Sequence, residues 1–257
     1  MAYMFLPALC SIILQKIHKE KSFRNLSISF RFNKWFIIAG IVPILYAFVT
    51  LGLNLLFPST SFSTNYEGLL SIIPAEQVDG IIEQLSKFPP IFFLFVTIIQ
   101  ALFAGYTLNA FFAFGEELGW RGYLLKALHD KKFIHVSLIT GLVWGLWHFP
   151  LILVGHNYPQ YPIAGVFMMV IWCILLSPVM AYITIKSKSV ITAAIFHGCL
   201  NAIAGIDLLY ILGGNSLING VKGIAGFIVL FFVNIGFYLY DKYITKENIF
   251  TKVIGEY

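Results

Sequence analysis

The chain is poor in charged residues. Of its 257 residues only 11% are charged, whereas 59% are hydrophobic. An ordinary soluble domain has about 25% charged residues. With a mean hydropathy of +0.83, the chain cannot cover a water-exposed surface with polar groups, which excludes a soluble globular enzyme, a disordered chain, collagen and a coiled coil. We therefore expect an all-α, polytopic transmembrane helical bundle, with residues 1–257 as a single integral membrane domain.

Cysteine is scarce as well. The three cysteines, Cys10, Cys173 and Cys199, lie in apolar segments and lack the spacing of metal ligands. This pattern excludes a disulfide framework and a zinc ribbon. Residues 1–15 are apolar and precede the first basic stretch, which is the reverse of the order in a cleavable signal peptide. We expect them to form a first, short membrane span.

Long runs of the chain contain no Asp, Glu, Lys or Arg at all. Four of them cover residues 35–57, 88–115, 133–185 and 189–206. An uncharged apolar run of about 18 residues or more is typical of a membrane span. The runs and their breaks predict about seven or eight membrane helices, near 2–16, 35–57, 89–105, 107–129, 134–154, 163–186, 189–212 and 217–241.

The loop charges predict an orientation. Residues 16–34 carry six Lys or Arg against Glu20, and residues 58–87 carry four acids against Lys87. The positive-inside rule places the first loop in the cytoplasm and the second outside. We expect the basic loop to contact the anionic lipid bilayer, and no nucleic acid. Segment 89–129 would be about 60 Å long as one helix, twice a bilayer core, so it either breaks near Gly105 or leaves the membrane at one end.

A few polar side chains interrupt the apolar spans and are the candidates for function, because ionisable groups in a membrane are costly. Glu117 and Arg121 are four residues apart and can pair on one helix face, while Glu116 is rotated away by about 100°. The other candidates are His148, with Trp144 one turn before it, and the i, i+4 pair His197 and Asn201. Counting along the helices from their basic ends places Glu116, His148, His197 and Asn201 near the middle of a core about 30 Å thick.

One carboxylate, two imidazoles and an amide at a shared depth predict a hydrolytic site. A carboxylate and a histidine can activate water, and a second His with an Asn can stabilise an oxyanion. Each group alone also fits a structural role in helix packing. It is the set that indicates chemistry.

Three motifs resemble those of the CPBP intramembrane proteases, the family of the CAAX prenyl endopeptidases and the bacterial Abi-type proteins. Glu116-Glu117-x-x-x-Arg121 resembles its first signature and His197-x-x-x-Asn201 its third. In the second, Phe-x-x-x-His, Trp144 takes the place of the Phe before His148. The flanking residues are similar to the bacterial branch, and we expect residues 90–211 to be the catalytic core.

The resemblance implies peptide-bond hydrolysis by an integral, multi-pass membrane protein. Its bacterial branch implies that the membrane is that of a bacterial cell. It assigns water activation to Glu116 and His148 and the oxyanion hole to His197 and Asn201, with Glu117, Arg121 and Trp144 in support and no cofactor. The substrate would be a membrane-embedded or membrane-associated peptide or protein. A link to bacteriocin self-immunity comes with the bacterial branch.

Two alternatives remain at this level. The same side chains, Glu116, His148 and His197, could bind zinc as an intramembrane metalloprotease with one open position. A non-enzymatic immunity or transport protein is the other, although no internal repeat typical of a transporter is visible. The sequence leaves open the physiological substrate, the oligomeric state and whether Asp207 joins the site.

Overall fold

A computed structural model describes residues 2–19 and 26–256. Glu20, Lys21 and Arg24 of the predicted basic loop lie outside these residues. The longer helices are α1 (Leu6–Ile17), α2 (Lys34–Asn54), α4 (Ala75–Ser86), α5 (Pro90–Tyr106), α6 (Leu108–Glu117), α8 (Phe133–Trp147), α10 (Pro162–Ser187), α11 (Val190–Ile203) and α13 (Ile224–Leu239). The short ones are α3 (Glu67–Leu70), α7 (Leu125–Ala127), α9 (Phe149–Leu153) and α12 (Asp207–Tyr210), with 3₁₀ turns at Ala2–Phe5, Ile249–Thr251 and Ile254–Glu256.

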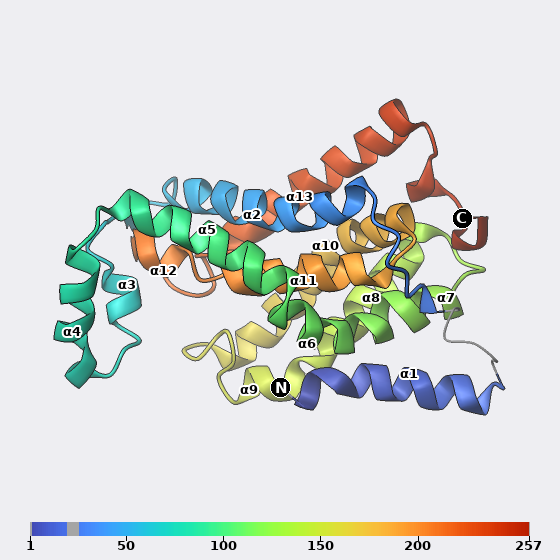
Figure 1. Cartoon of the computed structure of the whole chain (residues 1–257), viewed down its shortest axis with the longest axis horizontal. Helices are drawn as coiled ribbons and strands as arrows, with labels where there is room; N and C mark the ends of the chain where they lie inside the picture. Colours follow the sequence, from blue (N-terminus) through green and yellow to red (C-terminus); the bar gives the residue numbers. More distant parts are fainter. Residues whose placement is uncertain (1, 20–25, 257) are drawn as a thin grey trace.

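Strand structure within the described residues is confined to one small sheet. β1 (Thr60–Phe62) pairs antiparallel with β2 (Ile211–Gly213), with Thr60 opposite Gly213 and Phe62 opposite Ile211. The sheet ties the loop after α2 to the loop after α12. In Figure 1 helices α3 and α4 project together at one end of the molecule. They lie in the acidic loop 58–87, which the positive-inside rule places outside.

The predicted helical membrane bundle is confirmed, with fewer full-length spans than predicted. Four helices are long and apolar enough to cross a membrane, namely Lys34–Asn54, Pro162–Ser187, Val190–Tyr210 and Ile224–Thr245. A fifth is reached if α4 and α5, which meet at a bend of 102°, count as one span. Ala2–Ile17 and Phe133–Trp147 are apolar but shorter. All eight predicted helical regions exist, but several break into pieces that are too short to span alone.

The break in segment 89–129 falls at Thr107, two residues after the predicted Gly105. Thr107 has φ −122° and ψ −104°, outside the helical region, and separates α5 from α6. The side chain of Asn109, at the start of α6, donates to the carbonyl oxygen of Gly198 at 3.2 Å. The broken segment therefore wraps around α11 instead of running on as one long rod.

Helix α11 forms the centre of the bundle, packed against α2, α5 and α6 (Figure 1). Glycines allow α11 to approach α5 and α6 closely. A Cβ on Gly105 would lie 2.1 Å from Cys199 Sγ, and one on Gly198 would lie 2.7 Å from the backbone nitrogen of Ala110. Such small residues let membrane helices pack backbone to backbone. This contact fixes the position of His197, the neighbour of Gly198, against the end of α6.

The outer faces of the bundle are apolar. Ile37, Ile41 and Leu45 on α2, and Phe231 and Phe232 on α13, are all exposed large side chains. In water, an apolar surface of this extent would be unusual for a monomer. In a bilayer the same side chains meet lipid, so the surface agrees with the composition.

Candidate active site

The two adjacent glutamates close helix α6 and are both buried. Glu116 is 3% exposed and Glu117 is fully buried. The chain then continues as a π-helix over Leu118–Leu124, which contains Arg121, before α7 begins. A π-helical turn is rare and often marks a functional site, because it shifts the side chains that follow to a new angle.

Glu117 is the anchor of a buried charged network. Its Oε2 accepts a hydrogen bond from Arg121 Nη1 at 2.9 Å, and its Oε1 lies 2.9 Å from His197 Nδ1. The Arg121 Nη2 donates to Ser177 Oγ on α10, also at 2.9 Å. The predicted Glu117–Arg121 pair therefore exists, and it reaches further than predicted, because Glu117 itself holds His197.

Glu116 faces a different neighbour, helix α8, as its rotation by about 100° on the helix predicts. Its Oε2 accepts a hydrogen bond of 2.9 Å from Trp144 Nε1 on α8. The Arg121 guanidinium carbon lies 4.5 Å from the centre of the same indole ring, within the range of a cation–π contact. Trp144 is fully buried and connects the two glutamates through Arg121. Its indole thus orients a carboxylate, a role that the position of Trp144 one turn before His148 does not predict.

His148 lies at the junction between α8 and α9, and Pro150 lies in the first turn of the new helix. Its Nδ1 is 2.9 Å from the backbone carbonyl oxygen of Trp144. A carbonyl oxygen can only accept, so Nδ1 carries the proton, and in the neutral imidazole Nε2 is left as the basic nitrogen. Trp147 packs edge-on against the ring, with centroids 4.9 Å apart, and is itself stacked on Tyr3. The backbone and two aromatic rings thus define the orientation of His148.

His197 and Asn201 differ in their surroundings. His197 is buried and lies edge-on to Trp144, with ring centroids 5.4 Å apart. Its Nδ1 faces the Glu117 carboxylate, so an oxyanion would have to be met by Nε2, which donates only when both ring nitrogens are protonated. Asn201, one helical turn further along α11, is exposed. The structure therefore gathers Glu116, Glu117, Arg121, His148 and His197 around Trp144, and leaves Asn201 at the edge of this group.

Two residues that contribute to the site, Ser177 and Tyr3, were not predicted from the sequence. Ser177, which accepts a hydrogen bond from Arg121, is one polar residue in a long apolar helix, next to Pro178. Tyr3 stacks on Trp147 at 4.2 Å and donates to its carbonyl oxygen. Both lie outside the three motifs. A serine within an apolar membrane helix is the one sequence feature that could have indicated Ser177, and nothing indicated Tyr3.

A metal site is not assembled by these side chains. Among the residues that the structure describes, no three His, Cys, Asp or Glu side chains come close enough together to hold a metal ion. The alternative zinc ligands Glu116, His148 and His197 are not among such groups, and zinc dependence stays a prediction for the chelation experiment. Asp207 begins α12 and its carboxylate faces Gly220, away from the hydrogen bonds of the site.

A separate basic group lies in the loop before α13. Lys222 Nζ donates to Asn157 Oδ1 at 2.6 Å, and the Lys222 carbonyl oxygen accepts from the hydroxyl of Tyr158. Burial lowers the pKa of Lys222 to about 8, and the nearby Asp207 opposes that shift. This loop is thus tied to the loop after α9 through both the side chain and the backbone of one lysine.

The fold and the buried site define the class: a polytopic helical membrane protein with an acid–histidine cluster inside the bundle. Residues 86–203 match the family model described as type II CAAX prenyl endopeptidase Rce1-like. The chain is also 35% identical over 144 residues to CAAX prenyl protease 2 of Methanococcus maripaludis, a region that is 52% of this chain and 48% of that protein. The chain thus spans about half the length of the curated relative it matches.

The family resemblance predicted from the three motifs is therefore confirmed. The similarity to the Rce1-like CAAX prenyl endopeptidases lies in the segment 86–203. It contains the complete acid–histidine cluster, from Glu116 to His197, and ends just beyond Asn201.

Proposed function

We propose that this chain is an intramembrane endopeptidase that hydrolyses a peptide bond of a membrane-associated substrate, with a glutamate as the base. One observation supports this most strongly. Glu116 and His148 both contact Trp144, Glu116 through the indole Nε1 and His148 through the backbone carbonyl oxygen. Two groups able to accept a proton are thereby held at one buried residue of an apolar bundle.

In the proposed reaction, Glu116 and His148 activate a water molecule. The Trp144 indole holds Glu116 Oε2, so Oε1 is the oxygen proposed to accept the proton of water, while His148 Nε2 accepts a hydrogen bond from the same water. The hydroxide adds to the carbonyl carbon of the scissile bond. The C–N bond then breaks, and the proton held by Glu116 passes to the leaving amine.

His197 and Asn201 are proposed to stabilise the negative oxygen of the tetrahedral intermediate. The Glu117 carboxylate, bound by Arg121, accepts from His197 Nδ1 and directs Nε2 away from itself. The Asn201 amide, on the same face one turn on, supplies a second donor. Removing one oxyanion donor typically costs about 100- to 1,000-fold in rate.

Only the name of the matched protein suggests a substrate class. The matched protein is called a CAAX prenyl protease, so a prenylated peptide with a CAAX terminus is the first substrate to test on this chain. Unmodified transmembrane peptides are the second, because the site lies inside an apolar bundle.

The test is proteolysis by the purified full chain in nanodiscs, with both peptide classes. We expect Glu116→Gln to abolish cleavage, and Asn201→Ala to reduce it by about 100-fold or more without loss of stability. Glu76→Gln, an exposed acid in α4, serves as the matched control and should leave cleavage unchanged. Each sample is also run with a chelator.

Full activity in Glu116→Gln would refute the role of this carboxylate. Loss of activity on chelation, restored by zinc, would replace the glutamate mechanism with metal-dependent hydrolysis. A properly folded wild type that cleaves neither peptide class would contradict the proposed protease function.

A further inference from the structure

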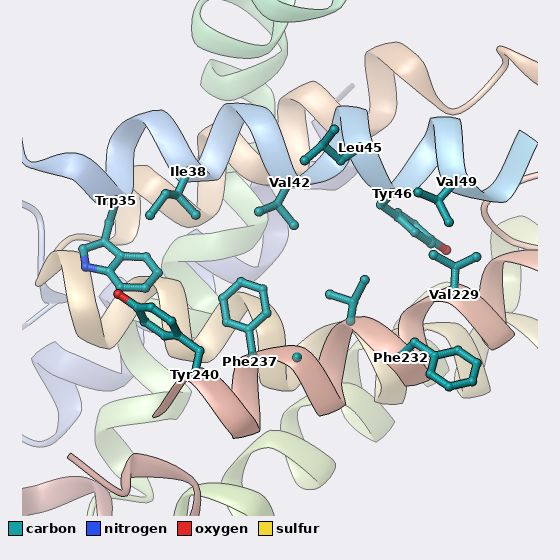
Figure 2. Close-up of a pocket in the computed structure, with 12 residues that line it drawn as sticks. Trp35, Ile38, Val42, Leu45, Tyr46, Val49, Val229, Phe232, Phe237 and Tyr240 are labelled. Carbon is teal, nitrogen blue, oxygen red and sulfur yellow. The ribbon is translucent and has the colours of Figure 1, made fainter. Parts of the chain in front are cut away.

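An apolar groove runs along the outside of the bundle between α2 and α13, on helix faces that carry none of the catalytic candidates. Figure 2 shows the side chains of the two helices lining it, with Trp35 and Tyr240 together at one end and Tyr46 and Val49 towards the other. Its volume is about 520 Å³. Ligand pockets in proteins typically measure about 300–1,000 Å³.

The groove is long enough for a single hydrocarbon chain. From Trp35 to Val49, α2 rises by about 21 Å, which is more than the thickness of one leaflet of a hydrocarbon core about 30 Å thick. The hydroxyl of Tyr46 is bound to the carbonyl oxygen of Val221 and accepts from Trp172, so it presents only its ring to the groove. Leu45 and Phe232 on the rim are exposed, so the groove opens towards the membrane.

The end of the groove at Trp35 is positively charged. Lys34 Nζ and Lys186 Nζ each lie 5.8 Å from the centre of the Trp35 ring. Lys186 is paired with Glu247, whereas Lys34 is exposed and donates to the hydroxyl of Tyr240 at 3.4 Å. Within residues 2–19 and 26–256, no carboxylate forms an ion pair with Lys34, so its charge is available to an anionic ligand at this end of the groove.

The position of this cation in the membrane also points to a lipid. Lys34 closes the basic segment 16–34, which the positive-inside rule places on the cytoplasmic side, where the anionic lipids of a membrane are concentrated. Tryptophan and tyrosine prefer the level of the lipid headgroups. A chain-length apolar groove that ends at an aromatic pair and an exposed lysine therefore matches the shape and charge of one anionic phospholipid.

We propose that the groove between α2 and α13 binds a single anionic phospholipid, with one acyl chain along the groove and the phosphate at Lys34. The bound lipid would fill the space between two helices that carry none of the candidate catalytic residues. This site is independent of the proposed protease function, and its test does not require cleavage.

Gly236 allows the groove to be filled without disturbing the fold. It lines the groove on α13, and a Cβ placed on it meets no atom within 4 Å. Gly52, on α2 outside the groove, is equally open and gives a matched control. Gly236→Phe and the smaller Gly236→Leu should therefore block the site, while Gly52→Phe should leave it intact.

The experiment is native mass spectrometry of the delipidated full chain in detergent, titrated with phosphatidylglycerol or phosphatidylcholine of the same acyl chains. We expect one phosphatidylglycerol to bind about fivefold more tightly than phosphatidylcholine, the factor for one lysine near an anionic headgroup. Lys34→Gln should remove this preference. Both Gly236 variants should lose the bound lipid, and Gly52→Phe should keep it. Quenching of wild-type fluorescence by brominated phosphatidylglycerol should fall in Trp35→Phe.

Several outcomes would overturn the proposal. Equal binding of the two lipids, or unchanged binding in both Gly236 variants that still show wild-type thermal unfolding, would exclude an anionic lipid site here. A change from dimer to monomer in Gly236→Phe would assign the face to a second copy of this chain. Displacement of the lipid by a prenylated peptide, with loss of cleavage in Gly236→Phe, would make the groove a substrate site instead.

Discussion

Removing the guanidinium of Arg121 is expected to destabilise the bundle strongly. Arg121 donates to both oxygens of Glu117, at 2.9 and 3.2 Å, and to Ser177, and it is fully buried. In Arg121→Met the Glu117 charge remains inside the protein without its cation. Breaking a buried ion pair in this way typically costs about 3–5 kcal/mol.

A second substitution distinguishes the cost of the unpaired Glu117 charge from the cost of the lost Arg121 hydrogen bonds. Glu117→Gln removes the negative charge but keeps a carbonyl oxygen that accepts from His197 Nδ1. The double variant Glu117→Gln with Arg121→Met should therefore recover most of the loss and lie within about 2 kcal/mol of the wild type. Its proteolytic activity should remain low, because a neutral amide in place of the Glu117 carboxylate no longer favours the doubly protonated His197 that an oxyanion donor requires.

The free energy of unfolding can be measured by titration with a denaturing detergent in bicelles. Lys131→Met is the matched control, because the Lys131–Asp130 pair is about half exposed on both sides, at 45% and 64%. Exposed pairs contribute only about 0–1 kcal/mol. The reasoning is refuted if Arg121→Met unfolds within about 0.5 kcal/mol of the wild type, or if the double variant is less stable than the single one.

Three further predictions concern other parts of the molecule. Trp144→Phe keeps an aromatic ring but leaves Glu116 Oε2 without its donor, so it should cost about 1–3 kcal/mol; an unchanged unfolding midpoint would contradict this hydrogen bond. Gly105→Ala places a Cβ 2.1 Å from Cys199 Sγ and 2.6 Å from its Cα, so the helices must separate at a cost of about 3 kcal/mol, to be measured in the same titration. The pKa of Lys222 is lowered from 10.5 to about 8, so between these values the unfolded state binds more protons and stability should rise with pH; below pH 8 this contribution is constant. Thermal unfolding at pH 7.5 and 9.5 should show the rise in the wild type and a smaller one in Lys222→Met, and equal slopes would count against the shift.

The amino-acid sequence was sufficient for the fold class and for two local features of the candidate site. Uncharged apolar runs of 18 or more residues predict membrane helices, in which every backbone polar group is satisfied within its own segment. Helical spacing then correctly predicted that Glu117 pairs with Arg121 and that Glu116 faces elsewhere. These are local properties of a helix, so they can be derived without knowledge of the neighbours.

The contacts between helices could not be predicted from the sequence. The hydrogen bond from His197 to Glu117 joins residues 80 positions apart, and the bond from Trp144 to Glu116 joins residues 28 apart. The first lies beside the backbone approach of Gly198 to α6, and both involve the helix that follows the break at Thr107. No periodicity within one helix predicts how its neighbours are rotated against it.

The sequence alone therefore determined that this protein lies in the membrane as a helical bundle, and which few polar side chains are available inside it. Composition decides whether a segment lies in lipid or in water, and the helical period decides which side chains share a face within one or two turns. Only the tertiary structure decided that Glu117, not Glu116, holds His197, that Trp144 orients Glu116, and that Asn201 lies at the edge of the group. Those choices depend on packing between distant segments, where close approach at glycine and the angle of one broken helix select a single arrangement.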